Sequence, residues 1–363
     1  MPDTTNAFRR ARVLRLPTAG PNDTLPLTRA IDAGEIDPAT IVAIVGKTEG
    51  NGCVNDYTRG YATLALKLLL SERLGCPLSQ IEQRVAIVMS GGTEGGLSPH
   101  LLVMCRESAP APKLPPRLAI GVGLTRPFRP EEIGRAAQIE ETATTVRLAM
   151  RDAGIADPAD VHFVQIKCPL LTKERIEEAS RRGAAVTTED TYYSMALSRG
   201  ASALGVALAL GEIREAHEAA ICRDWSLYSK VASTSAGVEL LRNEIVVLGN
   251  APGWGGNLVI GHDVMTDAID APAATRVLDR LGIGRDQVVA VLAKAEASPT
   301  GEIRGRRHTM LDDSDIHSTR HARALVGGAL AGAIGDTLLY VSGGAEHQGP
   351  AGGGPVAIIG AVA

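Results

Sequence analysis

The apolar positions of this chain gather into short runs, and three of these runs end at a lysine after a similar lead-in. Asp32–Lys47 reads DAGEIDPATIVAIVGK and Asp152–Lys167 reads DAGIADPADVHFVQIK, with Asp-Pro-Ala at the same offset. A weaker copy, DRLGIGRDQVVAVLAK, spans Asp279–Lys294 over the same fifteen-residue interval. Short β-branched and apolar runs are typical of buried strands, so each copy predicts a strand with a lysine at its end.

A predicted helix follows each of these lysines. Three alanine- and leucine-rich stretches have helical periodicity, and each has Ser-Arg or Thr-Arg near its start. We expect each arginine in the first turn of its helix. The stretches are 57–70, 197–210 and 318–333, and the arginines are Arg59, Arg199 and Arg320.

A serine turn completes each copy. Apolar or small-residue runs, predicted as strands, lead into the pattern Ser, small residue, Gly, any residue, Glu. We expect the three glutamates, Glu94, Glu239 and Glu346, to support a site as partners of other residues rather than to act in catalysis. The turns are SGGTE at Ser90, SAGVE at Ser235 and SGGAE at Ser342.

Three elements in the same order in three copies indicate an internal repeat. Proline- and glycine-rich joints at 107–117 and 249–257 separate the copies. The sequence therefore predicts an α/β fold of three similar repeats whose sheet ends point to a shared centre. The predicted repeats are 1–106, 112–250 and 256–363.

Composition narrows the class of protein. The 363 residues are 45% hydrophobic and 3% aromatic, with a net charge of −4 and no block of basic residues, which argues against a nucleic-acid partner. No apolar run approaches the length of a membrane span, and the N-terminal stretch lacks the features of a secretory signal. The five cysteines form no CxxC pair, so we expect a reduced, cytoplasmic protein without a disulfide framework.

The repeated residue types suit acyl transfer. A serine turn with exposed amides could hold a phosphate or stabilise an oxyanion, but the GxGxxG and Gly-Lys-Ser/Thr patterns of nucleotide loops are missing. A lysine whose pKa is lowered by burial and nearby cations can take the proton of a serine hydroxyl. An arginine can polarise a carbonyl. Three such sets around one centre fit a small ring of near three-fold symmetry, such as a cyclic triimide.

These residues resemble those of the cyanuric acid hydrolase and barbiturase family of cyclic amidases, across all three repeats. The resemblance implies three domains with pseudo-three-fold symmetry around a central active site, commonly a homotetramer, with no organic cofactor. It implies hydrolytic opening of cyanuric acid to carboxybiuret, which loses carbon dioxide to give biuret. It also implies Ser235 as nucleophile with Lys167 as base, and Lys47 and Lys294 in supporting pairs. The implied substrate-binding residues are Arg59, Ser90, Gly91, Arg199, Ser235, Ala236, Arg320, Ser342 and Gly343.

The same resemblance implies a structural metal site in the third repeat. Ligation through a carboxylate and backbone oxygens suits Mg²⁺ or Ca²⁺; a tight turn is the alternative interpretation. The implied ligands are Glu296, Ala345, Gln348, Gly349, Pro350 and Gly353.

Several alternatives stay open at this stage. The residues alone do not choose among the three serines, and Ser233 is a rival to Ser235 if the register is shifted. Barbiturate hydrolysis and non-catalytic binding of a small ring are alternative functions. His308, His317 and His321 lie in a polar segment with three aspartates, but no HExxH or related zinc pattern occurs there. We expect this segment to be a loop near the substrate.

Overall fold

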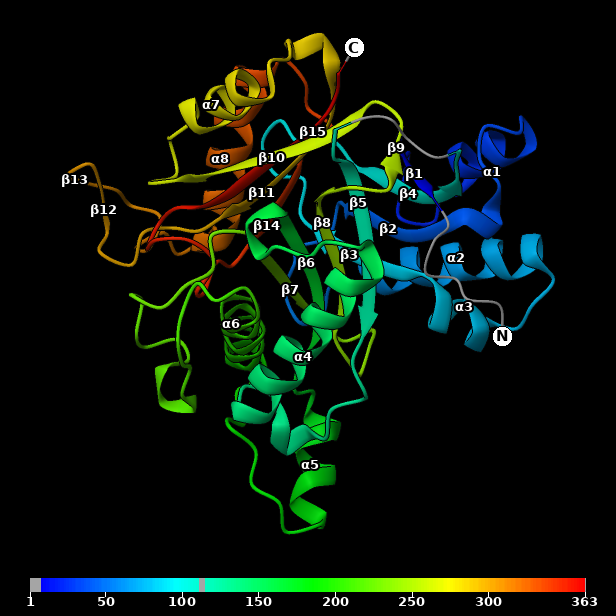
Figure 1. The fold of residues 1–363 in the computed structure, drawn as a ribbon. Helices are drawn as coiled ribbons and strands as arrows, with labels where there is room; N and C mark the ends of the chain where they lie inside the picture. The colour runs from blue at the N-terminus through cyan, green and yellow to red at the C-terminus, as the bar shows by residue number, and fades with distance from the viewer. Residues whose placement is uncertain (1–7, 111–114, 363) are drawn as a thin grey trace.

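Three sheets with one common strand order form the centre of the molecule, and most of the helices lie on the outside (Figure 1). The structure is a computed structural model that describes residues 8–110 and 115–362. In each sheet the order is third, second, fourth and first strand along the chain. The second and third strands are parallel, and the other neighbours are antiparallel. The predicted repetition of one α/β unit is therefore confirmed.

The first sheet has the order β3-β2-β4-β1, and the short strand β9 from a later joint adds to its edge. Asp56 caps the N-terminus of α2 by accepting from the amide of Thr58, and Gly75 ends this helix in the left-handed conformation. The elements are β1 (Arg9–Pro17), α1 (Leu25–Asp32), β2 (Ile41–Thr48), α2 (Tyr57–Leu74), α3 (Leu78–Arg84), β3 (Ala86–Gly91), β4 (His100–Ser108) and β9 (Trp254–Gly255).

The second sheet, β7-β6-β8-β5, carries the longest connections. Its helix α6 begins at Thr191, two turns before Arg199, so our expectation of Arg199 in a first turn was wrong. Asp190 caps this earlier start through the amides of Tyr192 and Tyr193. The elements are β5 (Arg117–Leu124), α4 (Ala136–Ala153), β6 (Val161–Pro169), α5 (Lys173–Arg181), α6 (Thr191–Ala209), β7 (Ala232–Gly237) and β8 (Glu244–Ala251).

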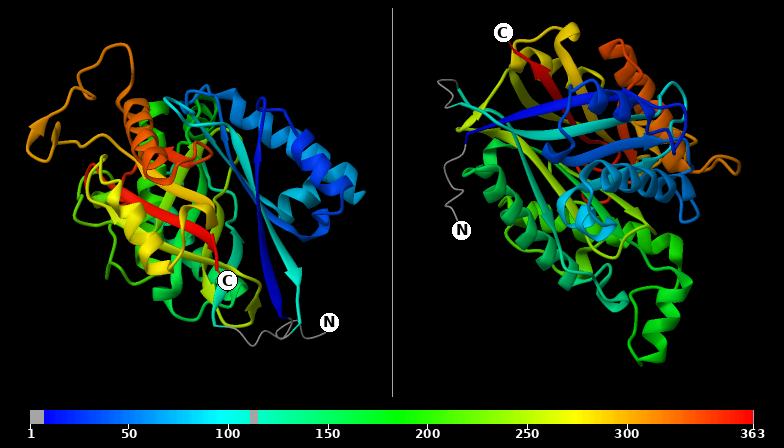
Figure 2. Two further views of the ribbon diagram at one scale, coloured as in Figure 1. Left: turned by 90° about the horizontal axis from the view of Figure 1, so that it is seen from above. Right: turned by 90° about the vertical axis from the view of Figure 1, so that its right-hand side faces the viewer.

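The third sheet has the order β14-β11-β15-β10. A two-stranded hairpin, β12 with β13, extends away from the body between β11 and α8, as the orange segment in Figure 2 shows. The elements are β10 (Leu258–Met265), α7 (Pro272–Leu281), β11 (Val288–Ala295), β12 (Glu302–Ile303), β13 (Arg306–Arg307), α8 (Ser318–Ile334), β14 (Tyr340–Gly343) and β15 (Gly354–Ala361).

The inner faces of the three sheets share one core. A single cluster of buried side chains contains Val45 of the first sheet, Val164 of the second and Leu292 of the third. Separate clusters lie between the first sheet and α1–α3 and between the third sheet and α7–α8. Alanine, valine, leucine and isoleucine fill nearly all of these positions, which fits the scarcity of aromatic residues. The lysine-bearing strand ends therefore meet near the centre.

No helix within the two described ranges is long and apolar enough to cross a membrane.

Candidate active site

The lysine and serine of each repeat are direct partners in the parallel ladder. Lys47 stands opposite Ser90, Lys167 opposite Ser235 and Lys294 opposite Ser342. Directly opposed residues project to the same face of a sheet. The distances from lysine Nζ to serine Oγ are accordingly short, at 3.3, 3.5 and 3.2 Å. The three repeats thus share one lysine–serine register, although 43, 68 and 48 residues separate the two partners in sequence.

Each lysine also reaches into a neighbouring repeat. Its Nζ donates to the carbonyl of the residue just before the neighbour's serine. The three bonds are Lys47 to Val341 at 2.8 Å, Lys167 to Met89 at 2.6 Å and Lys294 to Thr234 at 2.7 Å. Because each bond joins a different pair of repeats, the three bonds close a ring around the centre.

Burial shapes the acid–base properties of these lysines. All three are at most 1% exposed, and loss of solvation disfavours an ammonium ion. Burial, helped by Arg323 and Lys294, holds the pKa of Lys47 well below its usual range. Burial and Arg199 lower the pKa of Lys294 to about 7. Burial also lowers the pKa of Lys167, while the Glu239 carboxylate opposes this shift.

A small central cavity lies where the three repeats meet. Its free space is about 10 Å³, which is about the space that one water molecule needs. The lining residues are Gly52, Arg59, Ser90, Gly91, Met195, Arg199, Ser235, Ala236, Arg323, Ser342 and Gly343.

The third repeat contributes Arg323 to this lining, and Arg320, which we expected there, lies outside it. Arg320 is about 4.5 Å closer to the start of α8 and half-buried, whereas Arg323 is 3% exposed. The three lining arginines stand at different distances from their helix starts: Arg59 is the third residue of α2, Arg199 the ninth of α6 and Arg323 the sixth of α8. The feature that they share is the small residue that follows, which is Gly60, Gly200 and Ala324.

Two of the three motif glutamates pair with an arginine of a neighbouring repeat. Glu94 accepts from Nε and Nη2 of Arg323 at 2.8 and 2.5 Å. Glu346 accepts from Nε and Nη2 of Arg199 at 2.7 and 2.6 Å. Bidentate pairs of this kind are strong and fix the guanidinium plane. The glutamates thus hold these two arginines at the edge of the cavity.

The glycine of the serine turn makes room for these pairs. A Cβ on Gly92 would lie 2.5 Å from Nε of Arg323, and a Cβ on Gly344 would lie 2.5 Å from Nε of Arg199. Both glycines also have positive φ, at 101° and 79°. The pattern Ser-small-Gly-x-Glu therefore has a packing reason at its third position and an electrostatic reason at its fifth.

The middle repeat departs from this pattern. Glu239 lies 2.9 Å from Nζ of Lys167 instead of forming a bidentate pair with an arginine. Arg59 donates to the carbonyls of Ala236 and Cys53 at 2.7 and 2.6 Å. Its Nε lies 3.6 Å from Asp56, a fully buried carboxylate. Neither Asp56 nor Arg323 was among the residues that we expected at the site.

Of the residues expected at a metal site, Ala345 contacts Glu296 directly. The Glu296 side chain is half-buried, and its carboxylate accepts from the amides of Ala297 and Ala345 at 2.9 and 3.1 Å. Burial and the nearby Glu346 raise its pKa, and Arg199 and the two amides oppose this shift. The side chain of Gln348 is fully engaged with backbone groups, so only its backbone oxygen could serve as a ligand. A hard cation with oxygen ligands fits this group.

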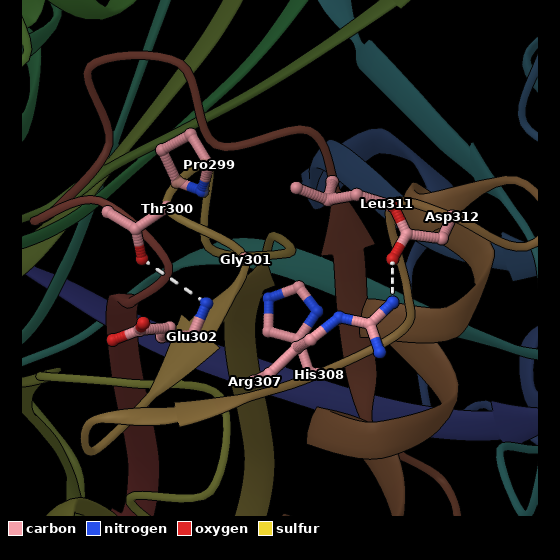
Figure 3. Close-up of a pocket in the computed structure, with 8 residues that line it drawn as sticks. All are labelled: Pro299, Thr300, Gly301, Glu302, Arg307, His308, Leu311 and Asp312. Carbon is pink, nitrogen blue, oxygen red and sulfur yellow. Dashed lines mark hydrogen bonds and ion pairs between the residues drawn. The ribbon is translucent and has the colours of Figure 1, made fainter.

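The segment with three histidines does not converge on one point. His308 contacts the carbonyl of Ser298, His317 contacts the hydroxyl of Tyr192, and His321 pairs with Asp313. Among the described residues, no group of three or more His, Cys, Asp or Glu side chains is placed to hold a metal. His308 instead lines a surface cleft of about 360 Å³ beside the hairpin (Figure 3). The cleft residues are Pro299, Thr300, Gly301, Glu302, Arg307, His308, Leu311 and Asp312.

Known proteins share both the sequence and the fold of this chain. The sequence model of the amidohydrolase ring-opening protein family matches residues 12–361. A cyanuric acid amidohydrolase from Ectopseudomonas oleovorans is 57% identical over 359 residues, covering 96% of this chain and 99% of that protein. One from Rhizobium johnstonii is 58% identical over 352 residues, with coverage of 96% and 97%.

Solved structures agree with this match. A cyanuric acid hydrolase described as an innovation by structural concatenation superposes with a TM-score of 0.95 at 54% identity, covering 98% of this chain and 100% of that one. The cyanuric acid hydrolase from A. caulinodans gives a TM-score of 0.92 at 56% identity, with coverage of 97% and 99%. The expected family resemblance is confirmed, and the chain belongs to the amidohydrolase ring-opening protein family, a family of hydrolases.

Proposed function

We propose that this protein hydrolyses the ring of cyanuric acid through Ser235 and Lys167. The observation that carries the proposal is the set of three lysine–serine pairs, in one register, around a single central cavity. The ring of cyanuric acid alternates three carbonyls with three N–H groups, so it matches three equivalent sets of donors. The activity of relatives that are more than half identical over nearly the whole chain supports the same substrate.

The reaction begins with attack of Ser235 Oγ on a ring carbonyl, while Lys167 Nζ takes the hydroxyl proton. Collapse of the tetrahedral intermediate breaks the C–N bond, and the new ammonium of Lys167 returns the proton to the ring nitrogen. Water, activated by Lys167, then cleaves the acyl-enzyme ester and releases carboxybiuret. Loss of carbon dioxide from this product gives biuret.

Amides of the serine turn stabilise the oxyanion in this proposal. In the first and third repeats the amide two residues after the serine already donates to a strand carbonyl, Gly92 to Thr48 and Gly344 to Ala295. In the middle repeat we assign the oxyanion to the amide of Ala236, the residue that follows the nucleophile. Arg59, Arg199 and Arg323 polarise the ring carbonyls.

A Mg²⁺ or Ca²⁺ ion at Glu296 forms a second, structural part of the proposal. The half-buried Glu296 carboxylate, which pairs with no cation within 4 Å among the described residues, supports it, with backbone oxygens of Ala345, Gln348, Gly349, Pro350 and Gly353 as proposed further ligands. Such an ion would neutralise Glu296 and tie the turn after Ser342 to β11. It takes no part in the proposed reaction.

We also propose a cytoplasmic homotetramer. One observation supports a subunit contact on α2, where Tyr57, Tyr61, Leu64 and Leu68 form a stripe of exposed apolar side chains along one face. Light scattering on the purified protein measures the number of subunits directly.

The experiment that tests the function is product analysis by mass spectrometry. Purified protein receives cyanuric acid or barbituric acid, each with and without a chelator. We expect biuret to form from cyanuric acid with and without the chelator, because the proposed ion takes no part in the reaction. Turnover of barbituric acid alone would assign the sister activity, and turnover of neither ring would refute the proposal.

Serine variants test the mechanism. Ser235→Ala removes the nucleophile, so we expect a loss of roughly 10⁴-fold or more in kcat. Ser90→Ala and Ser342→Ala are matched controls from the same turn, and their smaller losses should fall mainly on KM. An active Ser235→Ala protein would overturn the choice of dyad.

A further inference from the structure

Glu239 occupies the motif position at which the other two repeats place an arginine-bound glutamate. Its side chain is 8% exposed and lies 2.9 Å from Lys167, whose side chain is fully buried. Among the described residues, no carboxylate lies within 4 Å of Lys47 or Lys294. Each of these lysines donates instead to the carbonyl of the residue that follows its own serine, which is Gly91 or Gly343. Of the three lysines, Lys167 alone contacts both a serine and a buried carboxylate in the described part of the chain.

Asp56 accounts for this difference between the repeats. It lies three residues before Arg59, where the equivalent positions before Arg199 and Arg323 hold Ala196 and Arg320. The buried Asp56 carboxylate compensates part of the charge of Arg59. Position 91 must be glycine to leave room for Asp56, because a Cβ there would lie only 1.8 Å from its carboxylate oxygen. Glu239 is then free to pair with Lys167.

The charged groups around Lys167 act in opposite directions on its pKa. Glu239 stabilises the ammonium form, whereas burial and Arg59 disfavour it, and Cys168 is the other titratable neighbour. Lys167 and Arg59 hold the pKa of Glu239 below its usual range, and the Glu239 carboxylate contributes to the raised pKa of Glu244 on β8. Asp56 shares the charge of Arg59. Glu239 therefore stays ionised and limits how far the pKa of Lys167 falls.

We propose that Glu239 is the third member of a Ser235–Lys167–Glu239 triad and that it makes the middle lysine the competent base. As Ser235 Oγ bonds to the ring carbonyl, its proton moves to Lys167, and Glu239 stabilises the resulting ammonium. When the C–N bond breaks, the same proton passes to the ring nitrogen. Glu239 remains a carboxylate throughout, and it is a positioning residue because it acts on Lys167 rather than on the ring. This inference rests on the proposed Ser–Lys mechanism.

The test is the pH dependence of kcat and kcat/KM for Glu239→Gln. The amide keeps the size of the side chain but removes its charge, so we expect kcat to fall by roughly 10²–10⁴-fold. Removal of the carboxylate also lowers the pKa of Lys167, so the acidic limb of the kcat/KM profile should move to lower pH. Glu239→Asp retains the charge, so its kcat and the position of its acidic limb should both lie between those of Glu239→Gln and the unmodified protein.

Glu94→Gln is the matched control, because Glu94 holds the same motif position but pairs with Arg323. Its loss should appear mainly in KM, with the acidic limb unmoved. Asp56→Asn is a second probe that keeps a capping oxygen. Arg59 would then turn towards Glu239 and compete with Lys167 for its charge. The acidic limb of the kcat/KM profile should therefore move to lower pH, as in Glu239→Gln, but by a smaller amount.

The outcomes separate the triad from the dyad. An unmoved acidic limb in a folded Glu239→Gln protein, with a loss no larger than that of Glu94→Gln, would overturn the triad. If Ser235→Ala is inactive in the same assay, the dyad survives that result. Circular dichroism and thermal unfolding verify that each variant is folded.

Discussion

Arg323→Ala removes the cavity arginine that the third repeat contributes. Arg323 is almost fully buried, and its bidentate partner Glu94 has a side chain that is 23% exposed. Loss of one partner of a fully buried ion pair costs about 3–5 kcal/mol. Because Glu94 retains contact with water, we expect a smaller loss of stability, about 2 kcal/mol.

The effect on catalysis follows from the hydrogen bonds that Arg323 makes to the ring in the proposed mechanism. A hydrogen bond to a charged group contributes about 1.5–3 kcal/mol, and each 1.36 kcal/mol is tenfold in rate. We therefore expect kcat/KM for cyanuric acid to fall about 10- to 150-fold. Arg323→Lys should recover the charge but not the bidentate geometry, and so only part of the rate.

The assay is the initial rate of biuret formation over a range of cyanuric acid concentrations, with thermal unfolding measured in parallel. Arg320→Ala is the matched control on the same helix face, one turn earlier, and we expect a change of less than about threefold. The reasoning would be refuted if Arg320→Ala lost as much as predicted for Arg323→Ala while Arg323→Ala kept its rate.

Two further predictions concern backbone and pH. Gly344→Ala should lower both stability and kcat/KM, because its Cβ would lie 2.5 Å from Nε of Arg199; Gly335→Ala, which has positive φ but nothing within 4 Å of its Cβ, should show the backbone strain alone. His262 contacts His162 through a 2.8 Å bond between Nδ1 atoms, and burial lowers the pKa of His262 to about 4. The unfolded chain therefore binds more protons between about pH 6.5 and 4, so the melting temperature should fall as pH is lowered through this window. His262→Asn should make the melting temperature depend less on pH in this window. An unchanged dependence would contradict the lowered pKa of His262 as its cause.

Local patterns predicted much of the fold and of the site. Strand-ending lysines and serine turns depend on short-range sequence, so Lys47 and Ser90 could be assigned to one repeat; their ladder register is seen only in the structure. The cavity arginine of the third repeat could not be predicted in this way, because Thr319-Arg320 matches the Ser/Thr-Arg dipeptide of the other two repeats. The helix starts differ by three and six residues relative to the cavity arginine, and only the small residue after Arg323 indicates the correct alignment.

Contacts between repeats could not be predicted from the sequence for a different reason. The glutamates were predicted as supporting residues, but which cation each one meets depends on how three separate sheets pack. Glu239 and Glu346 occupy the same motif position, yet one pairs with a lysine of its own repeat and the other with an arginine of a neighbour. The residue that decides between these outcomes, Asp56, lies in another repeat and outside every repeated motif.

The ring of lysine bonds means that no repeat builds a complete site alone, since each lysine needs a carbonyl from a neighbour. Three separate copies of one ancestral unit could close the same ring, but identical chains would carry an aspartate at the Asp56 position in all three places or in none. Covalent fusion removes that constraint, because each unit then mutates independently. A single acidic substitution in one unit is then enough to give one of three equivalent lysines a different protonation behaviour. One lysine–serine pair of an otherwise symmetric binding cavity then becomes the reactive pair.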